Sequence, residues 1–194
     1  MDIYQKEDKE NIMSKFYTDW TQQDTVLDVF AGMYKNSVKD LINLCQDKIV
    51  VFDCDGTLTE FRYGNKHILP CRDADLNEYI LKDNFYSRAK FSVTMKYIID
   101  VLFPEDASEL YVVTTSLPNV APLKTKRLMQ AFSQLKEENI YHTPANTEKA
   151  RALQEIYNKH QKEIVFIEDN AEILLNVEEQ LPFVTSYHIS CLLP

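Results

Sequence analysis

Short apolar runs alternate with helical patterns along most of the chain, and this alternation restricts the possible folds more than any other feature. Runs rich in β-branched residues predict strands at residues 48–53, 109–114, 163–169 and 183–189, with a weaker one at 138–143. Between them, apolar spacings of three and four predict helices at residues 91–103, 119–136, 146–160 and 169–180. Strands of this kind, alternating with helices, are typical of a parallel sheet covered on both faces. With right-handed crossovers, the sequence predicts a three-layer, doubly wound α/β domain.

Residues 1–47 precede this alternation and have a helical pattern of their own. Aromatic and aliphatic side chains such as Phe16, Trp20 and Phe30 recur at mixed three- and four-residue spacing. We therefore expect an N-terminal helical extension, residues 1–47, that packs on a core of residues 48–194.

The charge balance is acidic, with 21 basic and 30 acidic residues and a formal net charge of −9. No sustained basic stripe is present to displace counterions, which argues against nucleic acid as a partner. No apolar stretch approaches the length of a membrane span, and the N-terminus has no secretory apolar region. These features predict a cytoplasmic protein without a membrane span in this segment.

Polar side chains gather where the predicted strands end. The residues concerned are Asp53, Thr114, Thr115, Glu168 and Asp169, and Lys149 follows the strand predicted at 138–143. A single acid at a strand end is usually a cap or turn former. Because parallel strands bring their carboxyl ends to one edge of the sheet, where the ligand crevice lies, we expect these side chains to converge there.

The acids among them predict a metal site. Asp53, Glu168 and Asp169 would offer oxygen ligands, and crowded carboxylates raise one another's pKa unless a cation compensates. The four cysteines form no CxxC pair, and no histidine cluster favours zinc. Mg²⁺ suits such a site best, since it prefers oxygen ligands and keeps waters and a substrate phosphate oxygen.

The stretch VVFDCDGTLTE, residues 50–60, places Asp53 and Asp55 two positions apart. A carboxylate such as Asp53 can attack phosphorus directly, and Asp55 can deliver a proton to the leaving oxygen. Thr114 or Thr115 can donate a hydrogen bond to the phosphate, and Lys149 can supply a positive charge. Taken alone, Lys149 on the amphipathic helix at 146–160 is as expected for a solvated side chain, but its place just after a strand end favours a functional role.

These stretches resemble the motifs of the haloacid dehalogenase (HAD) superfamily, in order and spacing. DCDGT at 53–57 is similar to the first motif, and VVTTS at 112–116 to the second. Lys149 in NTEKARAL is similar to the third, and IVFIEDNAEIL at 164–174 to the acidic fourth. The resemblance covers residues from about 47 to about 190, and the ordered set is more specific than any single motif.

The resemblance implies a Rossmann-like sheet with strand order 5-4-1-2-3 and Mg²⁺-dependent phosphoryl transfer through an aspartyl-phosphate. It makes Asp53 the nucleophile and Asp55 the general acid/base, with the Asp55 backbone carbonyl also on the metal. Phosphatases and phosphomutases of the family keep the second aspartate, whereas dehalogenases lack it. The chain is therefore expected to be a phosphatase or a phosphomutase.

The same resemblance assigns the remaining polar residues. Thr114, with Thr115 as the alternative, and Lys149 hold the phosphoryl group. Glu168 and Asp169 complete the metal site with Asp53. The assignment thus covers catalysis, phosphate binding and metal binding.

Substrate choice in this family comes from an insertion over the site, here a small one at about residues 60–90. A lightly covered site favours a phosphorylated protein, in particular phosphotyrosine, because a small metabolite usually needs more enclosure. Small sugar or nucleotide phosphates, a phosphomutase reaction, and a non-catalytic interaction module on the same fold are the alternatives. The abrupt end after SYHISCLLP suggests a fragment of a longer protein, and a bacterial effector delivered to a host cytosol is the alternative localisation.

Overall fold

The structure is a computed structural model and describes residues 25–60, 86, 89–104 and 107–192. These residues belong to two compact units. One unit comprises the chain up to Leu41 together with Cys191 onward, and the other comprises Ile42–Ser190. The strand ends singled out above all lie in the second unit.

The first unit contains most of the helix α2, Thr25–Cys45. Val38, Leu41 and Cys45 are buried along this helix at spacings of three and four residues, which is the pattern of one helical face. The predicted helical character of the extension is confirmed for this range, and residues 1–24 lie outside the described part of the chain. Packing of the extension on the core stays a prediction.

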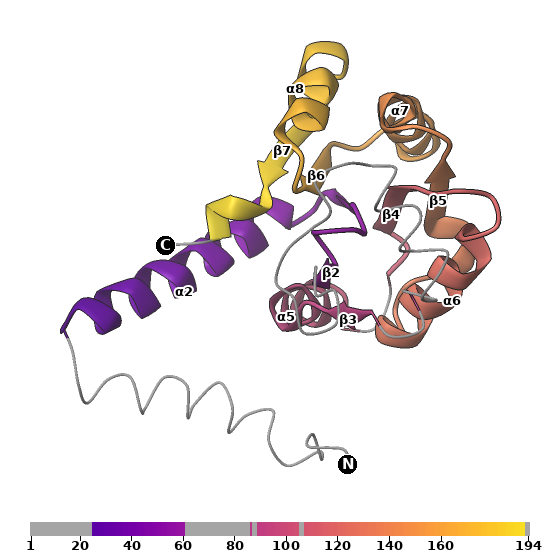
Figure 1. Cartoon of the computed structure of the whole chain (residues 1–194). Helices are drawn as coiled ribbons and strands as arrows, with labels where there is room; N and C mark the ends of the chain where they lie inside the picture. Colours follow the sequence, from indigo (N-terminus) through magenta and orange to yellow (C-terminus); the bar gives the residue numbers. More distant parts are fainter. Residues whose placement is uncertain (1–24, 61–85, 87–88, 105–106, 193–194) are drawn as a thin grey trace, which may run out of the picture. The chain divides into compact units, whose positions relative to one another are not determined.

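The second unit contains a five-stranded parallel sheet with the order β5-β4-β1-β6-β7 (Figure 1). Its strands are β1 (Ile49–Phe52), β4 (Leu110–Thr115), β5 (Ile140–Thr143), β6 (Ile164–Glu168) and β7 (Val184–His188). All five predicted strands are confirmed, including the weaker one at 138–143. The prediction of an α/β fold with a parallel sheet is therefore confirmed.

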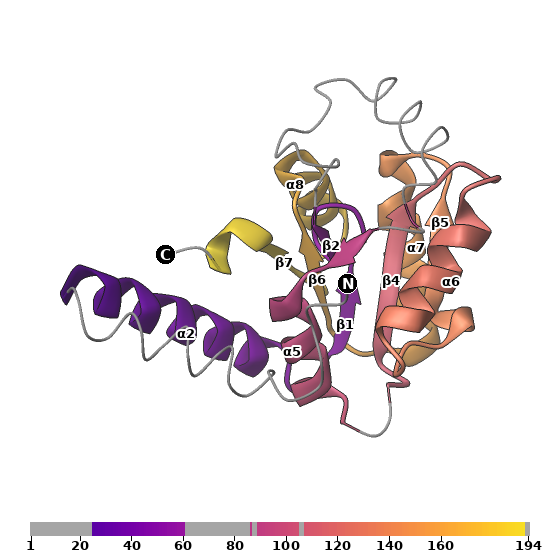
Figure 2. The ribbon, with the colours of Figure 1, turned by 60° about the horizontal axis from the view of Figure 1, so that its bottom comes forward.

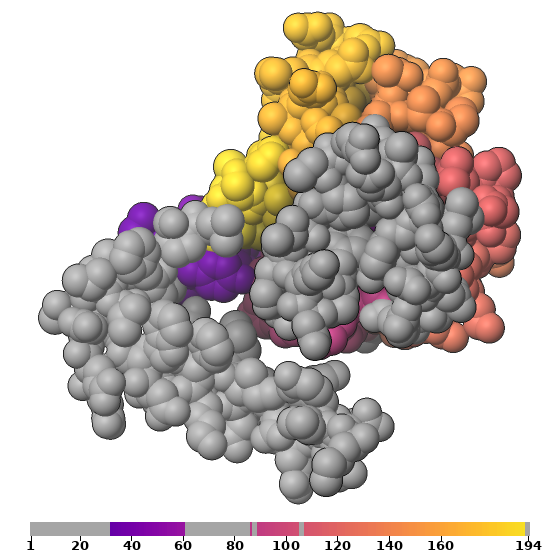
Figure 3. Space-filling view, viewed as in Figure 1, coloured from indigo at the N-terminus to yellow at the C-terminus, as the bar shows by residue number. Residues whose placement is uncertain are grey.

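Helices cover both faces of this sheet, as the continuous burial of β1 and β6 requires. On one face Ile49 and Val51 of β1 join an apolar core with α7 (Lys149–His160) and α8 (Ala171–Gln180). The helices α5 (Val93–Leu102) and α6 (Ala121–Ala131) cover the opposite face (Figures 1 and 2). At the surface α7 and α8 lie side by side (Figure 3).

Helix α6 is shorter than the sequence predicts, since it ends at Ala131 and the helical pattern continues to residue 136. Phe132 and Leu135 are buried, but a turn carries them, with the Leu135 amide donating to the Phe132 carbonyl at 3.0 Å. A turn can bury two side chains three residues apart as a helix does, so the spacing alone did not reveal the helix end.

Two short strands, β2 (Thr59–Glu60) and β3 (Lys90–Phe91), pair antiparallel at the two ends of the predicted insertion. Residues 61–85 and 87–88 lie outside the described part of the chain, and the size of the cover over the site stays a prediction. No helix within the described ranges is both long and apolar enough to cross a membrane.

Candidate active site

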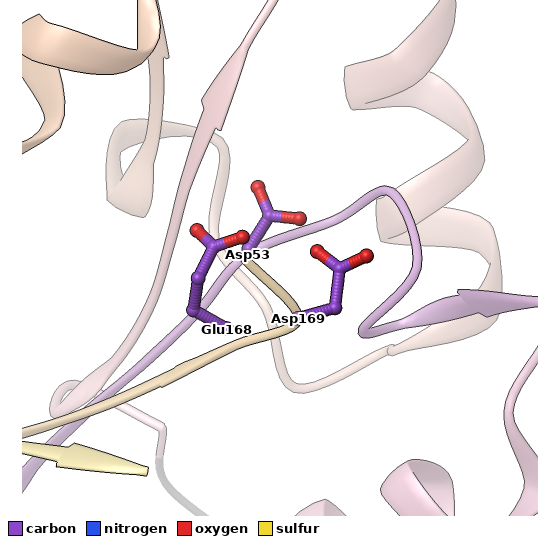
Figure 4. A group of neighbouring side chains, drawn as sticks. All are labelled: Asp53, Glu168 and Asp169. Carbon is purple, nitrogen blue, oxygen red and sulfur yellow. The ribbon is translucent and has the colours of Figure 1, made fainter. Parts of the chain in front are cut away.

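Three acidic side chains meet at the carboxyl edge of the sheet. Asp53 follows β1, Glu168 ends β6 and Asp169 comes next, and one carboxylate oxygen from each lies within 4.8 Å of the others (Figure 4). The backbone ladder accounts for this placement, because β1 and β6 are paired up to Phe52 and Ile167. The Asp53 amide extends the pairing by donating to the Ile167 carbonyl at 2.9 Å.

Lys149 lies within this acidic cluster. It is the first residue of α7, and its Nζ donates to Asp53 Oδ1 and to Glu168 Oε2, both at 2.7 Å. Only 2% of the residue is exposed. The structure therefore brings Lys149 to the strand ends, and the alternative of a solvated helix lysine is wrong.

Burial governs the electrostatics of the cluster. It raises the pKa of Asp53 to about 7, an effect that Lys149 opposes and that the neighbouring Glu168 increases. Burial likewise raises the pKa of Glu168 to about 7 and the pKa of Asp169 above its usual range. Burial alone would lower the pKa of Lys149, but the charges of Asp53 and Glu168 raise it above its ordinary value.

The cluster also has fewer positive than negative charges. When all three carboxylates are ionised, the single ammonium of Lys149 leaves two negative charges in a buried space. A divalent cation would supply the missing charge, and a ligand set made only of carboxylate oxygens suits a hard cation. The acidic cluster of Asp53, Glu168 and Asp169 can therefore hold a metal ion.

Asp55 is held apart from this cluster. Lys124 Nζ donates to Asp55 Oδ2 at 2.6 Å, and the Tyr86 hydroxyl lies 2.7 and 2.9 Å from the two Asp55 oxygens. Gly56 follows with φ 86°, a backbone conformation that glycine adopts without strain, and the chain turns there toward β2. The Asp55 side chain is thus bound to Lys124 and Tyr86, and its backbone carbonyl as a metal ligand stays a prediction.

The two threonines at the end of β4 have different partners. Thr114 is fully buried, and its hydroxyl accepts from Lys124 Nζ at 3.0 Å. The Thr115 hydroxyl donates to Asn146 Oδ1 at 2.7 Å and lies 3.1 Å from Thr143 Oγ1. Thr114 therefore lies on the same side as Asp55, whereas Thr115 is turned toward the end of β5.

Sequence reasoning missed Lys124. It lies on α6, is 1% exposed, and bonds Asp55, Thr114 and the Thr115 carbonyl, the last at 2.9 Å. One signal was present in the sequence, because Lys124 precedes the buried Leu128 by four residues and therefore falls on the apolar side of the helix. Tyr86, buried in the predicted insertion, was missed as well and has no comparable signal.

The asparagine after the acidic pair fixes the start of the next helix. Asn170 is the N-cap of α8, and its Oδ1 accepts from the amides of Glu172 at 2.9 Å and Ile173 at 3.4 Å. Caps of this kind set where a helix begins. The change from strand to helix therefore falls directly after Glu168 and Asp169.

Comparison of the sequence with models of known protein families gave no match, and a search of curated proteins found no similar sequence. Inference about function therefore depends on the ordered motifs and on the geometry of these strand ends.

Proposed function

We propose that the chain is a Mg²⁺-dependent phosphomonoester hydrolase that works through an aspartyl-phosphate on Asp53. The observation that carries the proposal is that the two aspartates, Asp53 and Asp55, are bound by different lysines. Asp53 lies with Lys149 in an acidic cluster able to hold an ion, while Asp55 is held outside it by Lys124 and Tyr86. One site thus offers a carboxylate nucleophile and a second carboxylate for proton transfer.

The order of the strands supports the same proposal. When only the five parallel strands are numbered along the chain, their order across the sheet is 3-2-1-4-5. Listed from the opposite edge, the same order is 5-4-1-2-3, the order expected from the resemblance to the HAD superfamily. In that arrangement β1 is central, and the first and fourth strands of the core are neighbours. The DCDGT stretch and the acidic pair therefore follow adjacent strands, which supports the resemblance.

The metal would be held by the carboxylates of Asp53, Glu168 and Asp169 and by the Asp55 carbonyl. A bound Mg²⁺ would neutralise part of the charge of the phosphate and of the cluster. Lys149 would add positive charge beside the phosphoryl group. Thr114 is favoured over Thr115 for phosphate binding, because its hydroxyl lies on the Asp55 side of the site.

The chemistry takes two steps at phosphorus. In the first, an Asp53 oxygen bonds to phosphorus as the ester oxygen leaves, and Asp55 gives that oxygen a proton. In the second, Asp55 takes a proton from water, and the water oxygen bonds to phosphorus as the bond to Asp53 breaks. Phosphate leaves, and Asp53 returns to its carboxylate form.

The substrate class belongs to the proposal too. The small size of the insertion at about 60–90 favours a phosphorylated side chain on a protein, phosphotyrosine in particular. A panel of phosphotyrosine peptides against sugar and nucleotide phosphates tests this choice. A clear preference for the small phosphates would replace the protein substrate with a metabolite.

The activity itself is tested on the full chain with p-nitrophenyl phosphate, with Mg²⁺ and with a chelator. We expect turnover that needs the metal, that is abolished in Asp53→Ala, and that survives in Asp100→Ala, a matched change at a half-exposed aspartate of α5. No turnover by the unchanged chain in the presence of Mg²⁺ would overturn the proposal.

A further inference from the structure

We infer that Lys124 is a positioning residue, which fixes the Asp55 carboxylate for proton transfer together with Tyr86. The inference rests on the proposed function and adds to it the part of the chain that orients the acid/base group. It also gives helix α6 a role in the site, since Lys124 lies in the first turns of that helix.

The contacts of Lys124 use its whole bonding capacity. An ammonium group has three N–H donors, and Nζ has three acceptors within reach, namely Asp55 Oδ2 at 2.6 Å, Thr114 Oγ1 at 3.0 Å and the Thr115 carbonyl at 2.9 Å. Two of these acceptors belong to the end of β4. Because that strand end is fixed in the sheet, Lys124 ties the carboxylate of Asp55 to a rigid element.

Tyr86 holds the same carboxylate, and α6 holds Tyr86. The hydroxyl of Tyr86 lies against both Asp55 oxygens, and its ring centroid is 5.0 Å from Lys124 Nζ. One turn along α6, Arg127 donates to the carbonyls of Tyr86 at 2.7 Å and Ala89 at 3.2 Å. Helix α6 therefore orients Asp55 twice, directly through Lys124 and indirectly through Arg127 and Tyr86.

Packing alone does not account for this arrangement. Lys124 precedes the buried Leu128 on the inner side of α6, where an aliphatic residue would fill the space without the cost of burying a charge. Proton transfer, by contrast, depends on hydrogen-bond geometry, and misplacing a reacting group by about 1 Å can cost about 100-fold in rate. Orientation of Asp55 is the gain that explains a buried lysine at this position.

The test compares two substrates that differ in how much they need a proton at the leaving oxygen. Phenyl phosphate releases a phenol like the tyrosine side chain, and p-nitrophenyl phosphate releases a more acidic one. The leaving group takes part only in the first step, which kcat/KM reports. In Lys124→Met we therefore expect kcat/KM to fall about tenfold or more further with phenyl phosphate than with p-nitrophenyl phosphate. Tyr86→Phe, a milder change that keeps the ring, should shift the ratio in the same direction.

The control is Lys126→Met, the same change at an exposed position of the same helix, which should leave the ratio unchanged. An equal loss of kcat/KM with both substrates in Lys124→Met and Tyr86→Phe would overturn the positioning role.

A second measurement tests the contact without relying on activity. The Tm values of Lys124→Met, Asp55→Asn and the double variant form a cycle, and we expect the double variant to lose clearly less than the two single losses combined. Additive losses would overturn the inference even in an active enzyme. Absence of turnover in the unchanged chain would instead refute the phosphatase proposal, and the cycle would still measure the coupling between Lys124 and Asp55.

Discussion

Asp53 and Asp55 are two residues apart in the chain, yet each carboxylate is bound by a different buried lysine. Lys149 Nζ lies 2.7 Å from Asp53 Oδ1, and Lys124 Nζ lies 2.6 Å from Asp55 Oδ2. The two negative charges are therefore compensated separately. Two acids so close in sequence can in this way have different environments, which a nucleophile and an acid/base group require.

Replacing Asp55 by Asn should separate the two steps of the reaction. With p-nitrophenyl phosphate the first step needs little help from an acid, whereas attack by water on the aspartyl-phosphate still needs a base. We expect steady-state turnover to fall about 10²- to 10⁴-fold and intact-protein mass spectrometry to detect an added phosphoryl group. Asp53→Asn should gain no phosphoryl group, and phosphorylation of that variant would contradict Asp53 as the nucleophile.

Divalent metal should stabilise the folded chain through the acidic cluster. At about 100 times its dissociation constant, Mg²⁺ should add about 2.7 kcal/mol to the free energy of unfolding, read as a rise in Tm. Glu168→Gln and Asp169→Asn each remove one carboxylate ligand and should reduce the increase in Tm that Mg²⁺ causes. Glu172→Gln, on the exposed first turn of α8, serves as the matched control and should preserve it. An unchanged rise in the two cluster variants would place the ion elsewhere.

Without divalent metal, stability should fall as the pH rises from about 5 to about 8. The pKa values of Asp53 and Glu168 are raised to about 7 in the folded chain, so between their ordinary values and 7 the folded state binds more protons than the unfolded state. The stability gained from these protons is lost as the pH passes through 7.

Thermal unfolding over this pH range checks the expectation. Glu168→Gln cannot titrate and should flatten the dependence of Tm on pH relative to the unchanged chain. An identical slope in both proteins would show that the acidic cluster does not control it.

The two kinds of lysine ion pair should differ sharply in their effect on stability. Lys149→Met leaves buried carboxylates without their cation and should lower the free energy of unfolding by about 3–5 kcal/mol in urea titrations without metal. Lys162→Met breaks a partly exposed pair with Glu109, also 2.7 Å long, and should cost about 1 kcal/mol or less. Similar losses in the two variants would argue against a charged Lys149 in the cluster.

The strands and their convergence were predictable because the signal is local. In β1 and β6 every residue is buried, so each strand is an apolar run bounded by polar residues. The parallel topology then fixes which edge receives Asp53, Glu168 and Asp169. The acidic cluster could thus be assembled from sequence without any knowledge of side-chain positions.

Lys124 and Tyr86 were not predictable in the same way, because their burial depends on a distant partner. Asp55 is 69 residues from Lys124 and 31 residues from Tyr86 along the chain. A lysine on an amphipathic helix is usually solvated, and only the tertiary contact reverses that expectation. The end of α6 was missed for a related reason, since the turn after it keeps Phe132 and Leu135 inside the core.

The β2–β3 ladder has a consequence for how such a chain can diversify. Thr59 pairs with Phe91 and Glu60 with Lys90, so the chain leaves the core and returns to it at nearly the same point. The entropic cost of closing a loop grows only slowly with the length of the loop. The paired strands β2 and β3 are therefore compatible with inserted segments of very different length between Glu60 and Tyr86. Under the proposed function, substrate recognition is then an exchangeable module, while Tyr86 and the residues proposed for catalysis stay unchanged.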